Sequence, residues 1–161
     1  MARVLVADNE LCTGCGICEL LCSYAKFKVF NPRRAAIHVV KLEPGMDAPI
    51  FCTQCGLCIP ACPEGALSRN PQTQVVVVDK EKCTGCGVCV LACPYGAVHV
   101  DPVTNKAVKC ELCGYCLKCP QSALKVVDVE EAVDWRRRNF ARAYTTAPQM
   151  FRKLWYKPPL K

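Results

Sequence analysis

Sixteen cysteines in a chain of 161 residues are the feature that most constrains this sequence. Such a fraction is typical of either a disulfide scaffold or a metal-binding protein. Aromatic residues make up only 7% of the chain, so side-chain packing alone would give a small core. The cysteines form four groups of four with none left over: Cys12, Cys15, Cys18 and Cys22; Cys52, Cys55, Cys58 and Cys62; Cys83, Cys86, Cys89 and Cys93; and Cys110, Cys113, Cys116 and Cys119.

We recognise no secretion signal and no membrane-spanning segment in the sequence. The apolar run in Met1–Asp8 is too short for a signal peptide, and an acidic residue follows it at once. The longest aliphatic run, Val75–Val78, is far shorter than the ~18 residues of a membrane span. We therefore expect a cytoplasmic protein without a membrane span. Disulfides are rare in that compartment, so the thiols indicate metal binding.

The spacing within the groups indicates which metal centre is bound. Three groups read C-x2-C-x2-C-x3-C, and two of them are followed directly by Pro63 and Pro94. Bacterial ferredoxins bind [4Fe–4S] clusters with this run, in which the fourth cysteine ligates the neighbouring cluster. Structural zinc, the rival metal, usually takes two C-x2-C pairs separated by a longer loop. The sequence therefore predicts four [4Fe–4S] clusters.

Internal repeats accompany the cysteine groups. Val4–Cys22 and Val75–Cys93 share twelve of nineteen residues, and Cys52–Leu67 shares ten of sixteen with Cys83–Val98 at a period of 31. Each unit reads as a strand, a cysteine loop, a helical turn and a second strand. We predict an α+β fold of tandem, pseudo-symmetric ferredoxin-like units, a turn at Glu43–Asp47, and strands at Arg3–Ala7, Ala36–Lys41, Val75–Val78, Val98–Val100 and Ala107–Lys109.

With these motifs, residues 1–127 resemble the four-cluster ferredoxin-type electron-transfer subunits of redox complexes. The compact form looks most like the small iron–sulfur subunits that accompany tungsten aldehyde oxidoreductases. The resemblance implies a non-catalytic subunit that wires a large tungsten- or molybdenum-containing catalytic subunit to a redox partner, such as a flavin/NAD(H) subunit. Subunits of hydrogenases, formate dehydrogenases and carbon monoxide dehydrogenases are the alternative within this class.

The resemblance also implies how the ligands are shared, because the outer motifs of that family hold one pair of clusters and the inner motifs another. The implied halves are residues 1–34 with 100–127, and residues 35–99. Two departures affect the outer pair: the last group is one residue shorter, and Ser23 replaces proline after the first group. One alternative is therefore a single local site for the whole last group. The implied sets are Cys12, Cys15, Cys18 with Cys119; Cys110, Cys113, Cys116 with Cys22; Cys52, Cys55, Cys58 with Cys93; and Cys83, Cys86, Cys89 with Cys62.

Residues 128–161 form a predicted basic helix and docking tail. Val129–Tyr144 reads as a helix that Asp128 could cap, and eight basic residues and no acidic ones follow from Trp135 to the end. The tail could pack on its own body, dock on another subunit, or join two copies of the chain. Cluster thiolates would offset the formal charge of +7, so that charge does not by itself indicate a nucleic-acid partner.

Catalytic motifs are missing from the sequence. We recognise no P-loop, dinucleotide fingerprint or catalytic triad, and His38 and His99 read as ordinary strand residues. No nucleic acid is expected, because no nucleic-acid-binding module is recognisable. The alternative of another class is an iron–sulfur redox sensor whose basic tail binds nucleic acid. Reversible reduction with cluster retention would distinguish an electron carrier from such a sensor.

Overall fold

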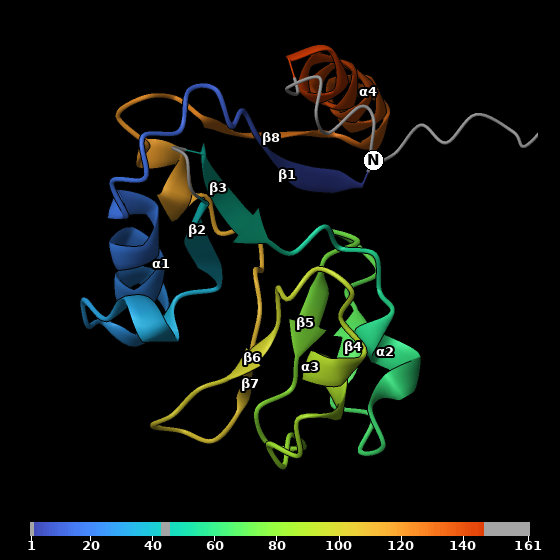
Figure 1. Cartoon of the computed structure of the whole chain (residues 1–161). Helices are drawn as coiled ribbons and strands as arrows, with labels where there is room; N and C mark the ends of the chain where they lie inside the picture. The colour runs from blue at the N-terminus through green and yellow to red at the C-terminus, as the bar shows by residue number, and fades with distance from the viewer. Residues whose placement is uncertain (1, 43–45, 147–161) are drawn as a thin grey trace, which may run out of the picture.

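The structure is a computed structural model that describes residues 2–42 and 46–146 (Figure 1). Its strands form four separate antiparallel ribbons of two strands each, and short helical segments connect them. The α+β class expected from the sequence is confirmed. The ribbons are β1 (Arg3–Ala7) with β8 (Leu124–Asp128), β2 (Ile37–Leu42) with β3 (Met46–Phe51), β4 (Leu67–Arg69) with β5 (Val76–Val78), and β6 (His99–Val100) with β7 (Ala107–Val108).

The lengths of the helices follow from the residues after each cysteine group. α2 (Cys58–Ala61) and α3 (Val88–Leu91) are single turns, and each ends within two residues of a cysteine–proline pair. Proline lacks the amide hydrogen and clashes with the preceding turn, so neither helix continues. In the first group Ser23 stands at that position, and α1 (Ile17–Phe27) runs on for eleven residues.

The last cysteine group is one residue shorter and has a different local helix. Its segment η2 (Tyr115–Lys118) is a 3₁₀-helix, which has three residues per turn instead of 3.6. The tighter turn accommodates the closer spacing of Cys116 and Cys119. A second 3₁₀-helix, η1 (Pro32–Arg34), links α1 to β2, and α4 (Val129–Thr146) follows β8 directly.

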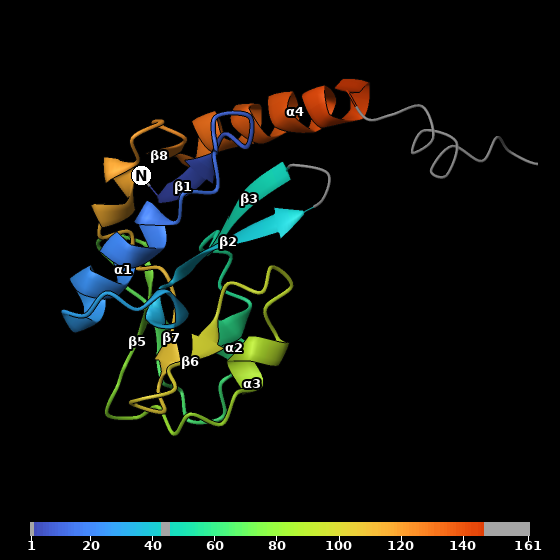
Figure 2. The ribbon, with the colours of Figure 1, turned by 60° about the vertical axis from the view of Figure 1, so that its left-hand side comes forward.

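The elements divide into two lobes, which Figures 1 and 2 both show. The inner lobe holds α2, α3 and β4 to β7, around a core that includes Val76, Leu67 and Val98. The outer lobe holds the remaining elements, with Leu5 and Ile37 in its core. The β1–β8 pairing brings together two segments that lie before and after the inner lobe in the sequence. Cysteine side chains belong to both cores, so the cysteine groups and the hydrophobic cores occupy the same regions.

Both faces of β1 are covered, which places α4 on the outer lobe. Leu5 points into the outer-lobe core, while Val4 and Val6 on the opposite face pack with Val127 and Ala132. Trp135 donates from Nε1 to the carbonyl of Ala7 at 3.0 Å. Figure 2 shows α4 lying along β1 and β8. None of the helices in the described part of the chain has the length and apolar character needed to cross a membrane.

All five predicted strands are confirmed, with ends that differ by at most one residue. Strands β3 and β4 were expected only in general terms, after the predicted turn and after the second cysteine loop, and β8 was not expected. Pro49 interrupts the β pattern of β3, and β4 has only three residues. The predicted turn at Glu43–Asp47 lies partly outside the described residues, and its last two residues begin β3.

The predicted C-terminal helix is also confirmed, with an end two residues later than expected. Asp128 pairs with Arg3 as the last residue of β8, and the first helical amide, on Val129, donates to the carbonyl of Ala2. Residues 147–161 lie outside the described chain, so the structure does not describe the predicted docking tail.

Candidate metal centres

Each of four small cavities in the structure is lined by four cysteines, and no cysteine lines two of them. We number them by the motif that supplies three of the four. Site 1 has Cys12, Cys15, Cys18 and Cys119; site 2 has Cys52, Cys55, Cys58 and Cys93; site 3 has Cys83, Cys86, Cys89 and Cys62; and site 4 has Cys110, Cys113, Cys116 and Cys22.

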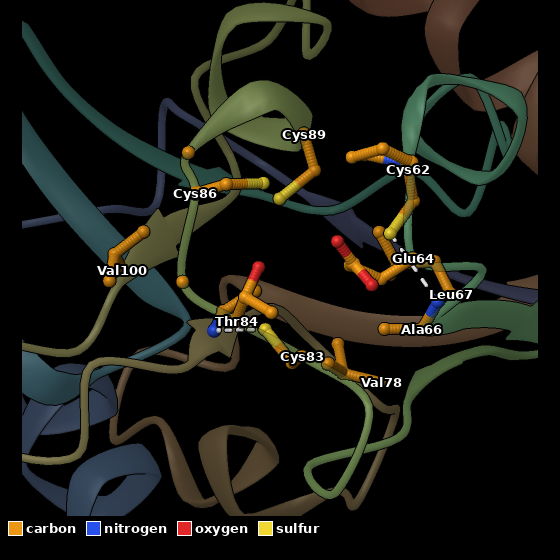
Figure 3. Close-up of a pocket in the computed structure, with 14 residues that line it drawn as sticks. Cys62, Glu64, Ala66, Leu67, Val78, Cys83, Thr84, Cys86, Cys89 and Val100 are labelled. Atoms are coloured by element: carbon orange, nitrogen blue, oxygen red, sulfur yellow. Dashed lines mark hydrogen bonds between the residues drawn. The ribbon is translucent and has the colours of Figure 1, made fainter.

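In every site the fourth cysteine comes from a different motif. Figure 3 shows this arrangement for site 3, where Cys62 faces Cys83, Cys86 and Cys89 across the cavity. The structure places Cys119 in site 1, away from the other cysteines of its own group. The sets gathered in the structure have the same members as those that the family resemblance implies.

The loops that carry the first three cysteines turn through a left-handed residue. The third position of each motif has a positive φ, between 54° and 76°, at Gly14, Gln54, Gly85 and Leu112. Gly85 is also required for close packing, because a Cβ there would collide with the carbonyl of Asn105. This turn directs the first three thiols of each motif into one cavity.

Backbone amides donate to three of the crossing cysteines. The amide of Ala36 lies 3.3 Å from Sγ of Cys22, and the amide of Ala66 lies 3.3 Å from Sγ of Cys62. The equivalent amide of Ala97 reaches Sγ of Cys93 at 3.4 Å. Such bonds orient a sulfur ligand and stabilise its negative charge. The Gly-Ala pair that follows the second and third motifs therefore has a role at the sites.

Burial differs among the thiols in a regular way. The second cysteine of each motif is exposed, whereas the third is buried. Burial raises the pKa of Cys18 and of Cys116 to about 12, and that of Cys110 to about 11. Without metal these thiols are protonated at neutral pH, so metal binding has to displace their protons. The exposed second cysteines place one edge of each site close to the surface.

The residues present fit a [4Fe–4S] group. Each cavity offers four sulfur donors within a largely apolar lining, and soft thiolates are the ligands of iron–sulfur clusters. Among the described residues, no three His, Cys, Asp or Glu side chains converge closely enough to hold a single metal ion. All sixteen cysteines lie in the described part of the chain, and none forms a disulfide.

Sequence reasoning did not single out two residues beside site 2. Lys109 is fully buried and lines the cavity, and Gln54 is 6% exposed and bonds to it. The sequence does contain one signal, because Gln54 stands where the first and third motifs have glycine. A non-glycine residue in a left-handed conformation is uncommon and indicates a local constraint.

Comparison with known proteins indicates the family to which the chain belongs. The 4Fe-4S dicluster domain matches residues 51–97, and the 4Fe-4S binding domain matches residues 9–25. The chain is 40% identical over 133 residues to the aliphatic sulfonate oxidoreductase, polyferredoxin-like subunit, of Pyrococcus furiosus. That match covers 77% of this chain and 76% of the relative.

Two further matches are looser. The chain is 31% identical over 141 residues to the NADH-dependent phenylglyoxylate dehydrogenase subunit beta of Aromatoleum evansii, covering 80% of this chain and 32% of that protein. The BamBC active site complex of benzoyl coenzyme A reductase superimposes with a TM-score of 0.47 at 20% identity, over 95% of this chain and 96% of that one. With two 4Fe-4S domain matches and 40% identity across three quarters of the Pyrococcus subunit, the chain belongs to the family of 4Fe-4S polyferredoxin-like proteins.

Proposed function

We propose that this protein is a non-catalytic electron-transfer subunit that holds four [4Fe–4S] clusters, with the four cysteines of each of sites 1 to 4 as ligands. When bound, such clusters accept and release single electrons. The observation that carries the proposal is the gathering of sixteen cysteines into four sets of four. The thiol-only donor sets and the absence of disulfides among them also support a cytoplasmic location.

The spacing of ligands along the chain supports electron transfer between neighbouring sites. Cys58 of site 2 and Cys62 of site 3 are joined through the single turn of α2. Cys18 of site 1 and Cys22 of site 4 lie one turn apart on α1, which is about 6 Å along the helix axis. Sites 2 and 3 therefore form one pair and sites 1 and 4 another.

A hydrogen bond connects the two pairs. The side chain of Gln54, which follows the first ligand of site 2, donates from Nε2 to the carbonyl of Cys110 in site 4 at 2.9 Å. The Cys52 and Cys110 thiols are also close enough that charge on Cys52 raises the pKa of Cys110, in addition to the larger effect of burial. We infer a linear electron path in the order site 3, site 2, site 4, site 1.

The exposed side of α4 supports docking on a second subunit. Val129, Val133 and Phe140 are spaced along one side of the helix and are 45%, 42% and 75% exposed. Beside them, an open hollow between β1, β3 and α4 includes Trp135 and Arg136. Aromatic residues and arginine are enriched at protein interfaces. The predicted docking tail from residue 147 onward is proposed to bind either another subunit or a second copy of the chain.

The partner that we propose is a large catalytic subunit containing tungsten or molybdenum, of the aldehyde oxidoreductase type, with a flavin/NAD(H) subunit as a further partner. The similar proteins support a place in an oxidoreductase complex, because one is a subunit of an aliphatic sulfonate oxidoreductase and another a subunit of an NADH-dependent dehydrogenase. A hydrogenase, formate dehydrogenase or carbon monoxide dehydrogenase is the alternative partner.

Anaerobic affinity purification from the native host tests the proposal. We expect a brown chain with about sixteen iron atoms, reversible reduction by dithionite, and a large co-purifying subunit with tungsten or molybdenum. Nickel would identify the alternative partners. A colourless zinc protein, or one that loses its clusters on reduction and then binds DNA, would contradict the proposal.

A further inference from the structure

Lys109 is the largest of the fully buried side chains that the structure describes, with 0% exposure. Its ammonium donates to the carbonyl of Val76 at 2.6 Å, to the carbonyl of Cys110 at 3.0 Å and to Oε1 of Gln54 at 3.2 Å. All three acceptors are neutral oxygens. The side chain lines site 2, and its own backbone leads directly into the first ligand of site 4.

A buried ammonium is costly unless a negative charge compensates it. Hydrogen bonds to carbonyl oxygens satisfy its donors but do not neutralise its charge. Lys109 lines the cavity that holds the four thiols of site 2, and a thiolate there can supply this negative charge.

Gln54 holds this lysine in place. Its Oε1 accepts from Lys109 and from the amide of Val76 at 3.0 Å, while its Nε2 donates to Cys110. Gln54 has φ 60°, a conformation that favours glycine. At the equivalent position of site 3 the residue is Gly85, which has no side chain with which to build such a network.

Lys106 offers an internal comparison at site 3. Its ammonium donates to the carbonyl of Cys83 at 2.6 Å, but the side chain is only partly buried. Solvent screens an exposed charge much more effectively than a buried one. Lys109 thus lines site 2 and bonds to the carbonyl of a site 4 cysteine, whereas Lys106 bonds to the carbonyl of a site 3 cysteine. Of the two lysines, only Lys109 is fully enclosed.

We propose that Lys109 is the buried counter-charge of site 2 and raises the reduction potential of the cluster bound there above that of site 3. The inference rests on the proposed function, since it concerns the clusters that we assign to these sites. Reduction adds a negative charge at the site, and a nearby buried cation favours that charge. Site 2 follows site 3 in the proposed path, so an electron that enters at site 3 is drawn towards the interior of the path.

Redox titration of the anaerobically purified holoprotein, followed by EPR, tests the role of Lys109. In K109M we expect one reduction step to move to lower potential, so that the ratio of reduced to oxidised cluster at a fixed potential falls at least tenfold, which is about 59 mV for one electron. K109R retains the charge, and its ratio should stay within threefold of wild type. The shifted step is assigned to site 2 if C55S, which alters a ligand of that site, displaces the same step.

The matched control is K106M, which removes the partly exposed lysine and should change the ratio less than threefold. Unchanged potentials in K109M, or an equal shift in K109R, would overturn the inference. If K109M loses one cluster while K109R keeps all of them, the result supports the need for a positive charge at this position. Loss of a cluster from both variants contradicts it, because the shape of the lysine side chain, and not its charge, would then be what the cluster requires. An iron-free wild type would overturn the proposed function as well, whereas a loaded wild type with no shift in K109M overturns only the inference.

Discussion

Asp101 and Arg34 form a buried ion pair between segments that are 67 residues apart in sequence. Nε and Nη2 of the arginine lie 2.7 and 2.8 Å from the two carboxylate oxygens, and the carboxylate also accepts from the amide and hydroxyl of Thr104. The guanidinium stacks on Phe27 at 3.9 Å from the ring centroid. The pair therefore ties η1 of the outer lobe to the β6–β7 turn of the inner lobe.

We expect Asp101→Asn to weaken the junction between the lobes. The amide cannot compensate the arginine charge, and it can accept through only one of its two side-chain atoms. The midpoint of anaerobic thermal unfolding should fall by about 5 °C or more. In the control, Asp134→Asn removes an exposed pair with Arg138 on α4 and should leave the midpoint nearly unchanged. An equal effect of both substitutions would contradict this role for the pair.

The pH dependence of the same pair has a defined sign. The Arg34 guanidinium holds the pKa of the Asp101 carboxyl well below its usual range. A carboxyl with a lowered folded pKa contributes its full stabilisation above the unfolded value, near 4, and loses it as the pH falls towards the folded value. The difference in unfolding midpoint between wild type and Asp101→Asn should therefore be constant between pH 6 and pH 8. A difference that disappears within that interval would contradict the lowered pKa.

At the scale of single elements, Ser23 shows how one residue sets the length of α1. Its side chain is fully buried, its hydroxyl donates to the carbonyl of Leu20 at 2.9 Å, and it accepts from the amide of Asn31 at 3.1 Å. The second and third motifs have proline here, and their helices are single turns. The serine thus allows the longer α1 and holds the loop that follows it.

Ser23→Pro would restore the ferredoxin-type motif, but we expect it to destabilise this protein. Proline inside α1 removes a helical hydrogen bond and clashes with the preceding turn, at a cost of about 3 kcal/mol or more. Ser23→Ala should cost about 1–2 kcal/mol, because it leaves the buried amide of Asn31 without its acceptor. Anaerobic urea unfolding followed by circular dichroism measures both. A proline variant that is as stable as wild type would contradict this role of Ser23 in α1.

Helix α4 docks through a small buried residue. Ala132 is 4% exposed and packs with Val4, Val6 and Val127. Ala132→Glu would bury a charge with no compensating partner, which should cost about 2 kcal/mol or more. Hydrogen exchange at the amides of α4 should then be more than tenfold faster than in wild type. Ala141→Glu, on an exposed part of the same helix, should stay within about 0.5 kcal/mol of wild type.

At the scale of the whole molecule, the exchange of fourth cysteines between motifs ties distant segments into single sites. Site 1 joins residues 12–18 to Cys119, and site 4 joins Cys22 to residues 110–116. The β1–β8 ribbon closes the same connection through backbone hydrogen bonds. Shared cavities and strand pairing therefore both hold the N-terminal segment of the chain against the segment that contains the last cysteine group and β8.

Double cysteine variants test the crossed ligand sets. With Cys62 in site 3, the pair C62S and C86S alters one site, so the double variant should lose about four iron atoms. The pair C62S and C55S alters two sites and should lose about eight. Iron analysis of proteins purified anaerobically distinguishes the cases. If Cys62 instead served its own motif, the two double variants would show the reverse pattern.

The spacing of the cysteines was enough to predict the cysteine loops, because a ferredoxin-type loop is determined by its cysteines and by its residues in left-handed conformation. The strands before and after each loop followed from β-branched runs such as Val76–Val78. The Asp101–Arg34 pair and the burial of Lys109 depend on how the lobes pack, and no local pattern records this. Lysine is almost never fully buried, so the residue type alone suggested a surface position.

The nested connectivity of the chain has a consequence for biosynthesis. A nascent chain leaves the ribosome from its N-terminus, and domains generally fold as units while synthesis continues. All eight cysteines of sites 2 and 3 have been translated once Cys93 is added, whereas site 1 waits for Cys119. The inner lobe can thus be loaded with iron while β1 still has no partner strand. Maturation would then proceed from the middle of the polypeptide towards its two ends, with the N-terminal cysteine loop completed last.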